Sequence, residues 1–191
     1  MNISLKEKLL KSINNDGHPK KLHRYSCSNI YALLQGWEKP ETYLEPKTFD
    51  FLNAYRMWQG KWKHQQVQSL MPDYIQELKV VKEVGNLTIV GMADLINDEE
   101  VIEIKTSEKL HNKAKAWHLH QCKLYCILFD RPVGRIVQPV KSGDSLYLKV
   151  IGEVKKDPKW FAREMEKLKV IDDKITEHYA KGINGVSKRT Q

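Results

Sequence analysis

Two acidic residues and a lysine, Asp94, Glu103 and Lys105, have the types and the spacing of a reactive site. Asp94 and Glu103 flank a short polar turn at residues 97–100, so a tight hairpin would bring the two carboxylates side by side. Side chains alternate along a strand, which puts Glu103 and Lys105 on one face. Ile104 then points into the core, while its carbonyl oxygen stays free to act as a ligand.

Two carboxylates and a carbonyl make a hard oxygen cage, which suits Mg²⁺, with Mn²⁺ as a substitute. A cation held there can bind a phosphate oxygen, lower the pKa of a bound water and neutralise charge in the transition state. The ammonium group of Lys105 adds a second positive charge at the attacked phosphate and can orient the water. These groups predict metal-assisted hydrolysis of a phosphodiester.

Chance alternation is the competing interpretation of Glu103-Ile104-Lys105. Acids and lysines alternate on the solvated face of many antiparallel strands, so this short pattern alone carries little weight. Three further features favour the functional interpretation: Asp94 on the paired strand, the apolar residues on both sides, and the helical pattern that follows.

The segments that must position these residues change from helical to strand-like patterns along the chain. Apolar residues at three- and four-residue steps, with capping and breaking residues at the ends, predict helices at residues 4–13, 29–34, 48–70, 109–129 and 157–181. Runs rich in Val, Ile and Thr predict strands at residues 74–84, 86–96, 100–106, 134–140 and 145–154. Ser4 and Glu7 form a capping-box pattern, Gly182 is the expected end of the last helix, and residues 37–46 are expected to form a loop.

The order of these elements predicts an α/β (α+β) fold. The first three strands form an antiparallel meander, and the crossover through a helix to the fourth strand implies a parallel pairing. We therefore expect one central mixed β-sheet flanked by helices. Residues 1–191 are expected to form a single domain with a helical N-terminal part (1–72), a sheet core that carries the site (73–155), a C-terminal helix (156–184) and a polar tail (185–191).

The composition is that of a globular chain that meets polyanions. The net charge is +8, from 32 Lys and Arg residues against 24 Asp and Glu residues, and such a balance favours encounter with nucleic acid. No apolar run is long enough to cross a bilayer, and no secretory signal is visible. We expect no membrane association and a cytoplasmic location, or the host cytoplasm if the source is viral.

The three cysteines, Cys27, Cys122 and Cys126, are expected to be buried free thiols. They cannot all pair with one another, and no secretion signal suggests oxidation. A zinc or iron–sulfur site would need further soft ligands, which the neighbouring sequence lacks.

Four motifs in order carry a resemblance to a known family. They are Gly60-Lys61-Trp62-Lys63-His64, Gly91-Met92-Ala93-Asp94, Glu103-Ile104-Lys105 and Gln121-Cys122-Lys123-Leu124-Tyr125. Together they resemble the PD-(D/E)XK nucleases, and specifically the RecB-like exonuclease branch. The resemblance implies a restriction-endonuclease-like core with N-terminal helical additions.

The resemblance also implies a role for each residue of the site. His64 would supply a nitrogen ligand to the metal ion from the preceding helix. Asp94 and Glu103 would be the carboxylate ligands, and the Ile104 carbonyl would complete the protein's contribution. Lys105 would be the catalytic lysine.

Gln121 and Tyr125 would face the site from one ridge of the following helix, since they are four residues apart. There they would hold substrate or a water next to the metal. Family members with an iron–sulfur cluster carry cysteines towards the carboxyl terminus, and no cysteine follows Cys126 here, so no such cluster is expected. The chain has no helicase region, so a helicase, recombination or CRISPR partner would be a separate chain.

The expected function is that of a Mg²⁺-dependent deoxyribonuclease, an exonuclease that acts on single- or double-stranded DNA ends in repair or recombination. Two alternatives stay open. One is a structure-selective or restriction-type endonuclease, and the other is a non-catalytic nucleic-acid-binding or scaffold protein with the same fold. Cleavage polarity, RNA tolerance and oligomeric state do not follow from the sequence.

Other residues near the motifs have weaker functional interpretations. His118 and His120 lie about 200° apart on a helix, so they cannot easily share a metal, and solvated or core positions are favoured over DNA contact. Trp117 could stack on a base, but core packing is favoured. Phosphate contact and solvated charge are equally open for Lys20, Lys21, His23, Arg24, Lys109, Lys113 and Lys115.

Overall fold

The computed structural model describes residues 20–45, 50–107, 109–143 and 145–186, together with residues 4 and 7; for residues 182–186 it describes the backbone alone. Ser4 and Glu7 make the reciprocal hydrogen bonds of a capping box, as predicted: the Ser4 amide donates to Glu7 Oε2 at 2.9 Å and the Glu7 amide to Ser4 Oγ at 3.2 Å. The rest of the helix expected at residues 4–13 and most of the polar tail lie outside the described residues.

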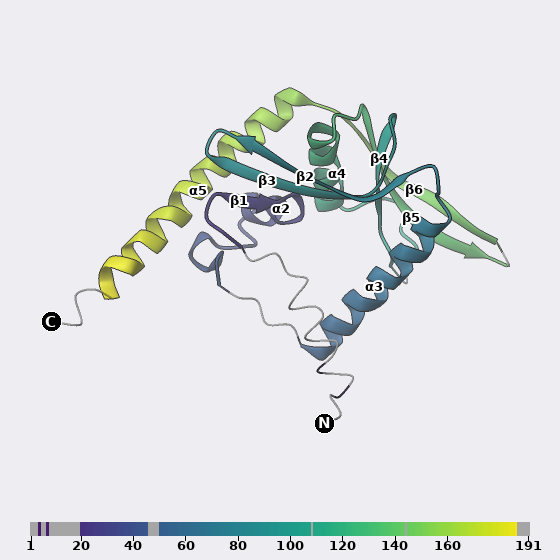
Figure 1. The fold of residues 1–191 in the computed structure, drawn as a ribbon, viewed down its shortest axis with the longest axis horizontal. Helices are drawn as coiled ribbons and strands as arrows, with labels where there is room; N and C mark the ends of the chain where they lie inside the picture. The colour runs from purple at the N-terminus through teal and green to yellow at the C-terminus, as the bar shows by residue number, and fades with distance from the viewer. Residues whose placement is uncertain are drawn as a thin grey trace.

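The described strands form one mixed six-stranded sheet in the order β1–β3–β4–β5–β6, with β2 paired to β3 (Figure 1). The elements in chain order are β1 (Arg24–Ser26), α2 (Cys27–Leu34), the short 3-10 helix η1 (Pro40–Thr42), α3 (Phe51–Ser69), β2 (Ile75–Val84), β3 (Leu87–Ile96), β4 (Glu100–Ile104), α4 (Ala116–Leu128), β5 (Val133–Ser142), β6 (Ser145–Lys155) and α5 (Pro158–Val186). This confirms the predicted α/β fold with a central mixed sheet flanked by helices.

The antiparallel meander and the parallel crossover both occur as predicted. A turn with Gly85 at a φ of +61° joins β2 to β3, and β3 turns back into β4 in antiparallel register. The chain then crosses through α4, and β5 pairs with β4 in parallel. One edge of β3 carries β2. The opposite edge pairs with β1 up to Val90 and with β4 from Leu95, which leaves residues 91–94 between the two ladders.

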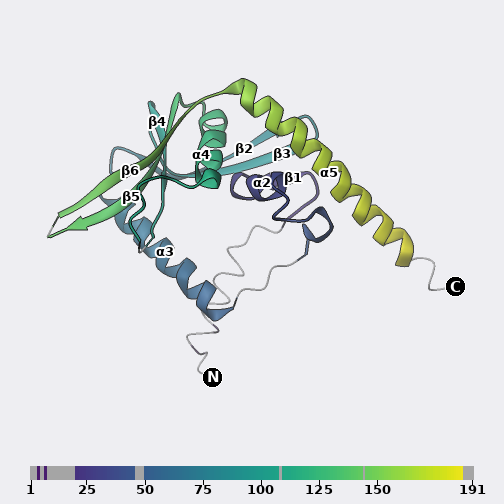
Figure 2. The ribbon, with the colours of Figure 1, turned by 180° about the vertical axis from the view of Figure 1, so that it is seen from behind.

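Helices pack on both faces of the sheet (Figures 1 and 2). On one face, residues of α2, α4 and α5 form the main core with β1 and β3, and Leu124, Leu168 and Ile175 are fully buried there. Burial of each such side chain contributes about 1.5–3 kcal/mol. On the other face, Val67 of α3 packs on Leu95, a β3 residue, and its neighbours in β4 and β5.

Four elements differ from the sequence prediction. The short 3-10 helix η1 lies within residues 37–46, which were expected to form a loop. Strand β1 was missed, because three residues are too few to show an alternating pattern. Helix α5 continues through Gly182 to Val186, so that glycine does not end it. The helix predicted at residues 109–129 begins only at Ala116. The residues before it form a loop, because the Gln138 side chain bonds to the loop backbone: it accepts from the His111 amide at 2.9 Å and donates to the Lys109 carbonyl at 2.7 Å.

Helix α3 has the predicted helical spacing but leaves its aromatic stripe in solvent. Asp50 caps the helix by accepting from the Asn53 amide at 2.7 Å. Ala54, Val67 and Gln68 are its buried residues. The aromatic residues of the stripe are all exposed: Phe51, Tyr55, Trp58 and Trp62.

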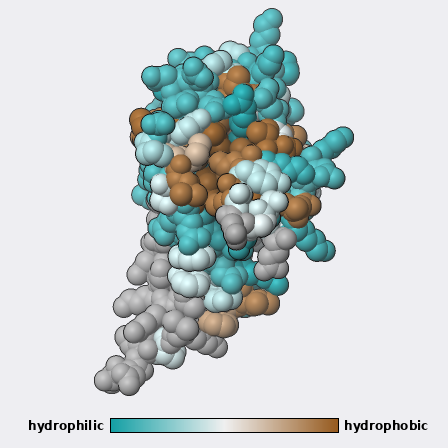
Figure 3. Space-filling model, turned by 90° about the vertical axis from the view of Figure 1, so that its right-hand side faces the viewer, coloured by the Kyte–Doolittle hydropathy of each residue, from teal (hydrophilic) through white to brown (hydrophobic). Residues whose placement is uncertain are grey.

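Apolar side chains also gather around the C-terminal end of α3. Leu70 and Met71 face Leu146 and Tyr147 of β6 across a hollow of about 360 Å³. Figure 3 shows an apolar patch on the side of the molecule where these elements lie. None of the helices in the described part of the chain is both long and apolar enough to cross a lipid bilayer.

Candidate active site

The β3–β4 hairpin brings Asp94 and Glu103 to the point where the two strands separate. The ladder pairs Ile96 with Val101 and Leu95 with Ile102, so Asp94 and Glu103 come next in the same register. Beyond that pair the backbone ladder stops, and the Ile104 amide donates instead to Asp94 Oδ2 at 2.6 Å. The Asp94 carboxylate therefore takes the place of a backbone carbonyl, which fixes its position at the open end of the hairpin.

Glu103 is a buried carboxylate that is only partly satisfied. Its side chain accepts at Oε1 from the Lys105 ammonium, whereas Oε2 is buried and has no hydrogen-bond partner among the described residues. Burial, and then the negative charge of Asp94, raise the pKa of Glu103 to about 7, although Lys105 and His64 pull it down. A positive charge placed next to Oε2 would stabilise the ionised carboxylate.

Helix α3 delivers His64 to the same carboxylates. Its Nδ1 lies 3.3 Å from Asp94 Oδ1. Burial alone would lower the pKa of His64, but the hydrogen bond and the charge of Asp94 outweigh it and raise that pKa. Gly60 lies beside the exit of β4, where a Cβ would be in ordinary van der Waals contact with Thr106 Oγ1 at 3.5 Å, so this approach of α3 does not require a glycine.

Gln68 also positions α3 and was not recognised in the sequence. Its Nε2 donates to the Asp94 carbonyl at 3.0 Å, and its own backbone carbonyl accepts from Gln76 of β2. Gln68 lies one helical turn after His64, so the four-residue spacing was the available signal.

Gln121 and Tyr125 lie on one ridge of α4, and their side chains are hydrogen-bonded to each other. Gln121 Nε2 donates to the Tyr125 hydroxyl at 2.7 Å. Tyr125 is buried, and burial followed by the charge of Glu103 raises its pKa well above the usual value, so the hydroxyl stays protonated. Gly91 makes room for this helix, because a Cβ there would lie 2.8 Å from Leu128 Cδ1 and 3.2 Å from Tyr125 Cε1.

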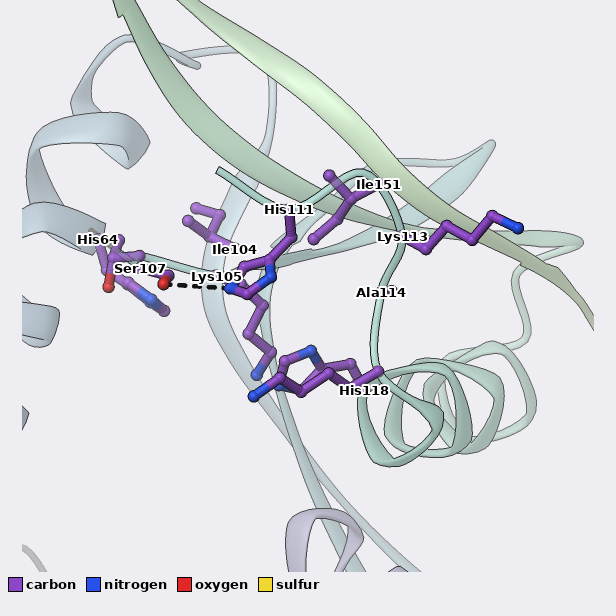
Figure 4. A pocket seen from close by; sticks show the side chains of 11 residues that line it. His64, Ile104, Lys105, Ser107, His111, Lys113, Ala114, His118 and Ile151 are labelled. Carbon is purple, nitrogen blue, oxygen red and sulfur yellow. Dashed lines mark hydrogen bonds between the residues drawn. The ribbon is translucent and has the colours of Figure 1, made fainter. Parts of the chain in front are cut away.

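The other α4 residues considered from the sequence lie in different surroundings. His118 lines a cavity beside Lys105 (Figure 4), whereas His120 is a core residue with its Nε2 3.1 Å from Glu164 Oε2. The expectation that Trp117 packs in the core is wrong: it is 38% exposed and rests edge-on against Trp37.

All three cysteines are buried free thiols, as predicted. Cys122 and Cys126 face Gly134 of β5, where a Cβ would lie 2.7 and 2.8 Å from their sulfur atoms. The close packing of α4 on the sheet accounts for their burial.

The predicted metal ligands meet at the site but do not form a ready-made metal cage. Across the described residues, no three His, Cys, Asp or Glu side chains are grouped to hold a metal ion. The reason is visible in the pairing: Lys105 engages Glu103, and His64 faces Asp94. The donor set nevertheless fits a hard divalent cation. The Asp94 and Glu103 carboxylates are adjacent, and the buried Glu103 Oε2 has no hydrogen-bond partner within the described part of the chain.

Solved structures with the same fold come from several sources. The protein SSO0001 has a TM-score of 0.63 and 22% identity, over 91% of this chain and 86% of that one. An alkaline exonuclease from Laribacter hongkongensis has a TM-score of 0.62 and 11% identity, over 96% and 100%. A phage-related exonuclease from Haemophilus somnus 129PT has a TM-score of 0.52 and 11% identity, over 91% and 99%.

Sequence comparison assigns the family. None of the curated proteins matches this chain. The family model of the PD-(D/E)XK nuclease superfamily matches residues 9–190, which span the β3–β4 hairpin, the His64 helix and the Gln121–Tyr125 ridge. The chain belongs to the PD-(D/E)XK nuclease superfamily.

Proposed function

We propose that this nuclease is a Mg²⁺-dependent deoxyribonuclease that acts as an exonuclease on DNA ends, with Mn²⁺ as a substitute cation. One observation carries the proposal: the buried Glu103 Oε2 has no partner among the residues that the structure describes, and it lies in a site with Asp94, His64 and Lys105. A site built only for binding would gain nothing from two carboxylates forced together beside a phosphate-binding surface.

We propose a role for each residue of the site. Asp94 and Glu103 would hold the cation, together with the Ile104 carbonyl and His64. A divalent cation, when bound, would neutralise charge on the attacked phosphate and lower the pKa of a water. Lys105 adds a fixed positive charge next to the carboxylates, where it can hold a phosphate oxygen.

Gln121 and Tyr125 are positioned to act as a pair. The amide donates to the hydroxyl, so the tyrosine hydroxyl proton remains available for substrate or water. The position of this ridge, with the His64 helix on the opposite side of the hairpin, supports our further proposal that the chain belongs to the RecB-like branch.

DNA as substrate and attack at ends are supported by charge and by the solved structures. The net charge of +8 favours a polyanion. Two of the similar structures are described as exonucleases, and the Laribacter enzyme was also solved in complex with dAMP, with a TM-score of 0.59 and 13% identity to this chain.

Digestion of labelled DNA tests the proposal. Linear single- and double-stranded DNA, labelled at the 5′ or the 3′ end, is compared with closed circular DNA, with Mg²⁺, with Mn²⁺ and with a chelator. We expect mononucleotide release from linear DNA only, dependent on the cation, and loss of at least about 100-fold in Asp94→Asn and Lys105→Ala. His64→Ala should shift the Mg²⁺ titration to higher concentration while the fold is kept.

Each other outcome has a definite meaning. Cleavage of closed circles would identify an endonuclease. Binding without cleavage under both cations would identify a non-catalytic binding protein. Equal digestion by the parent, Asp94→Asn and Lys105→Ala would remove the site from the reaction.

A further inference from the structure

Beyond Lys105 the site opens into a cavity of about 270 Å³ between the end of β4, the loop after it and the start of α4 (Figure 4). Among the described residues, the polar lining consists of ring nitrogens, ammonium groups and hydroxyls, without a carboxylate. The charged or ring-bearing residues of the lining are His64, Lys105, His111, Lys113, Lys115 and His118, of which Lys113 directs its ammonium group away from the cavity (Figure 4). This composition favours an anion.

The wall of the cavity is held in place by the sheet. Gln138 of β5 holds the loop at the His111 amide, and the Ala114 amide donates to the Ile151 carbonyl of β6 at 2.7 Å. The His111 ring lies 3.3 Å from Ser107 Oγ. The cavity is therefore formed before any ligand arrives, which lowers the entropic cost of binding.

Positive charge faces the interior of the cavity. Burial lowers the pKa of His118 to about 4, and the nearby Lys105, Lys115 and His111 lower it further. The His118 ring is therefore neutral at neutral pH, and its buried Nδ1 has no hydrogen-bond partner in the described part of the chain. Lys115 is the N-cap of α4 and makes no side-chain capping bond, so first-turn amides of that helix add to the positive potential.

We propose that this cavity binds a phosphate group of the DNA strand next to the phosphate that is cleaved. The inference rests on the proposed function for the identity of the polymer. Lysine ammonium groups, imidazole N–H groups and helix N-terminal amides are the donors that proteins use for such contacts. The phosphate is either the terminal monoester of the strand or an internal diester, and both present the same anionic oxygens.

Lys113 and Lys115 provide a matched pair for the test. Both are exposed and lie two residues apart, so each alanine variant removes one charge from the same loop. Lys115 contributes to the potential at His118, whereas the Lys113 side chain points away from the cavity in Figure 4. A contact inside the cavity should therefore depend on Lys115 alone.

The measurement is binding of single-stranded oligonucleotides in a chelator, by fluorescence anisotropy over a series of salt concentrations. The oligonucleotides carry a 5′-phosphate, a 3′-phosphate or hydroxyls at both ends. We expect Lys115→Ala to lower the slope of log affinity against log salt by about 0.7, the value for one lost phosphate contact on a single strand. Lys113→Ala should leave the slope unchanged, and Lys115→Arg should restore it.

The oligonucleotides distinguish the two sources of phosphate. If Lys115→Ala removes the preference for one phosphorylated end, the cavity holds a terminal phosphate. If it weakens all three oligonucleotides equally, the cavity holds an internal one. Equal loss of oligonucleotide affinity in the Lys113 and Lys115 variants would mean that the loop attracts DNA by its overall positive charge. That result would overturn the proposal.

The binding assay needs neither a cation nor cleavage. The proposal for the cavity and the proposal for the nuclease activity can therefore be contradicted independently. A chain that degrades DNA normally but shows no difference between the two variants refutes the cavity alone. A chain that shows the Lys115-specific loss but cuts no DNA refutes the catalytic proposal alone.

Discussion

Glu103 lies at the centre of the site with one oxygen hydrogen-bonded to Lys105, and the other is buried without a partner in the described ranges of the chain. Leaving a buried charged acceptor unsatisfied costs free energy, because its hydration is lost and no bond replaces it. This cost of burial, followed by the negative charge of Asp94, raises the pKa of Glu103 to about 7, and it makes the ionised site a place where a cation is favoured.

The stability of the metal-free protein should therefore reflect the charge on Glu103. A carboxyl group whose pKa rises from 4.5 unfolded to about 7 folded contributes stability that is complete below the unfolded value. That contribution is lost as the pH rises through about 7. In a chelator, we expect the melting temperature of the parent to fall relative to Glu103→Gln between pH 5 and pH 8.

The pH dependence of the melting temperature is compared between the parent and Glu103→Gln, because groups that titrate alike in both proteins cancel in the difference. The pKa values of His118 and His120 are lowered, so their contributions change in the opposite direction in both proteins. Addition of Mg²⁺ at pH 8 should then raise the melting temperature of the parent only. A parent-to-variant difference that stays constant across this pH range would contradict the assigned cause.

At the residue level, alternation and a short turn were sufficient to predict the pairing of Asp94 with Glu103 and the shared face of Glu103 and Lys105. His64 could be placed only through the resemblance, since a helical histidine has no signal of its own. His118 and Gln68 reach their positions by packing of α4 and α3 on the sheet. The four-residue spacing from His64 was a local signal for Gln68, whereas the contacts that place His118 are long-range and leave no local pattern in the sequence.

The junction of β3 and α4 is the element contact on which the site depends. Gly91 lies where the backbone of β3 meets Tyr125 and Leu128 of α4. We expect Gly91→Ala to destabilise the protein by about 1–3 kcal/mol, because the added methyl group overpacks this contact. The shift of Tyr125 should also lower nuclease activity, and denaturant unfolding together with digestion of linear DNA measures the two effects.

Gly60→Ala is the matched control for this substitution. A methyl group at Gly60 has a neighbour only at van der Waals distance, Thr106 Oγ1 at 3.5 Å, and alanine favours the helix by up to about 1 kcal/mol. The two alanine variants should therefore change stability in opposite directions. Equal stability of the Gly91→Ala variant and the parent would show that α4 can move away from β3 without cost.

Elements with strong local patterns could be predicted, and those made by distant contacts could not. The β2–β3 hairpin has a turn glycine between two β-branched runs, and α3 has a capping aspartate and regular apolar spacing. Residues 109–115 also have helix-forming composition, but Gln138 and Ile151 bond their backbone and hold it in a loop. Tertiary hydrogen bonds outcompete propensity there, because the loop is fixed on β5 and β6.

At the scale of the whole molecule, Asp172 joins three distant parts of the chain. This α5 residue is fully buried and accepts from the Tyr25 hydroxyl of β1 at 2.6 Å and from Asn86 in the β2–β3 turn at 3.3 Å. His23 Nδ1 lies 2.7 Å from Asp172 Oδ2, the oxygen that also accepts from Asn86, whereas Tyr25 donates to Oδ1. The C-terminal helix, the first strand and the hairpin are therefore coupled through one carboxylate.

Such coupling leads us to expect one cooperative unfolding transition, in agreement with the single domain predicted from the sequence. Asp172→Ala should lower the free energy of unfolding by about 1–3 kcal/mol, because the buried hydroxyl of Tyr25 would lose its acceptor. Asp173→Ala, at the exposed neighbouring position of the same helix, should leave it nearly unchanged. Circular dichroism and tryptophan fluorescence should report the same midpoint in each variant. Two separate transitions in Asp172→Ala would instead show that α5 unfolds independently of the sheet that carries the site.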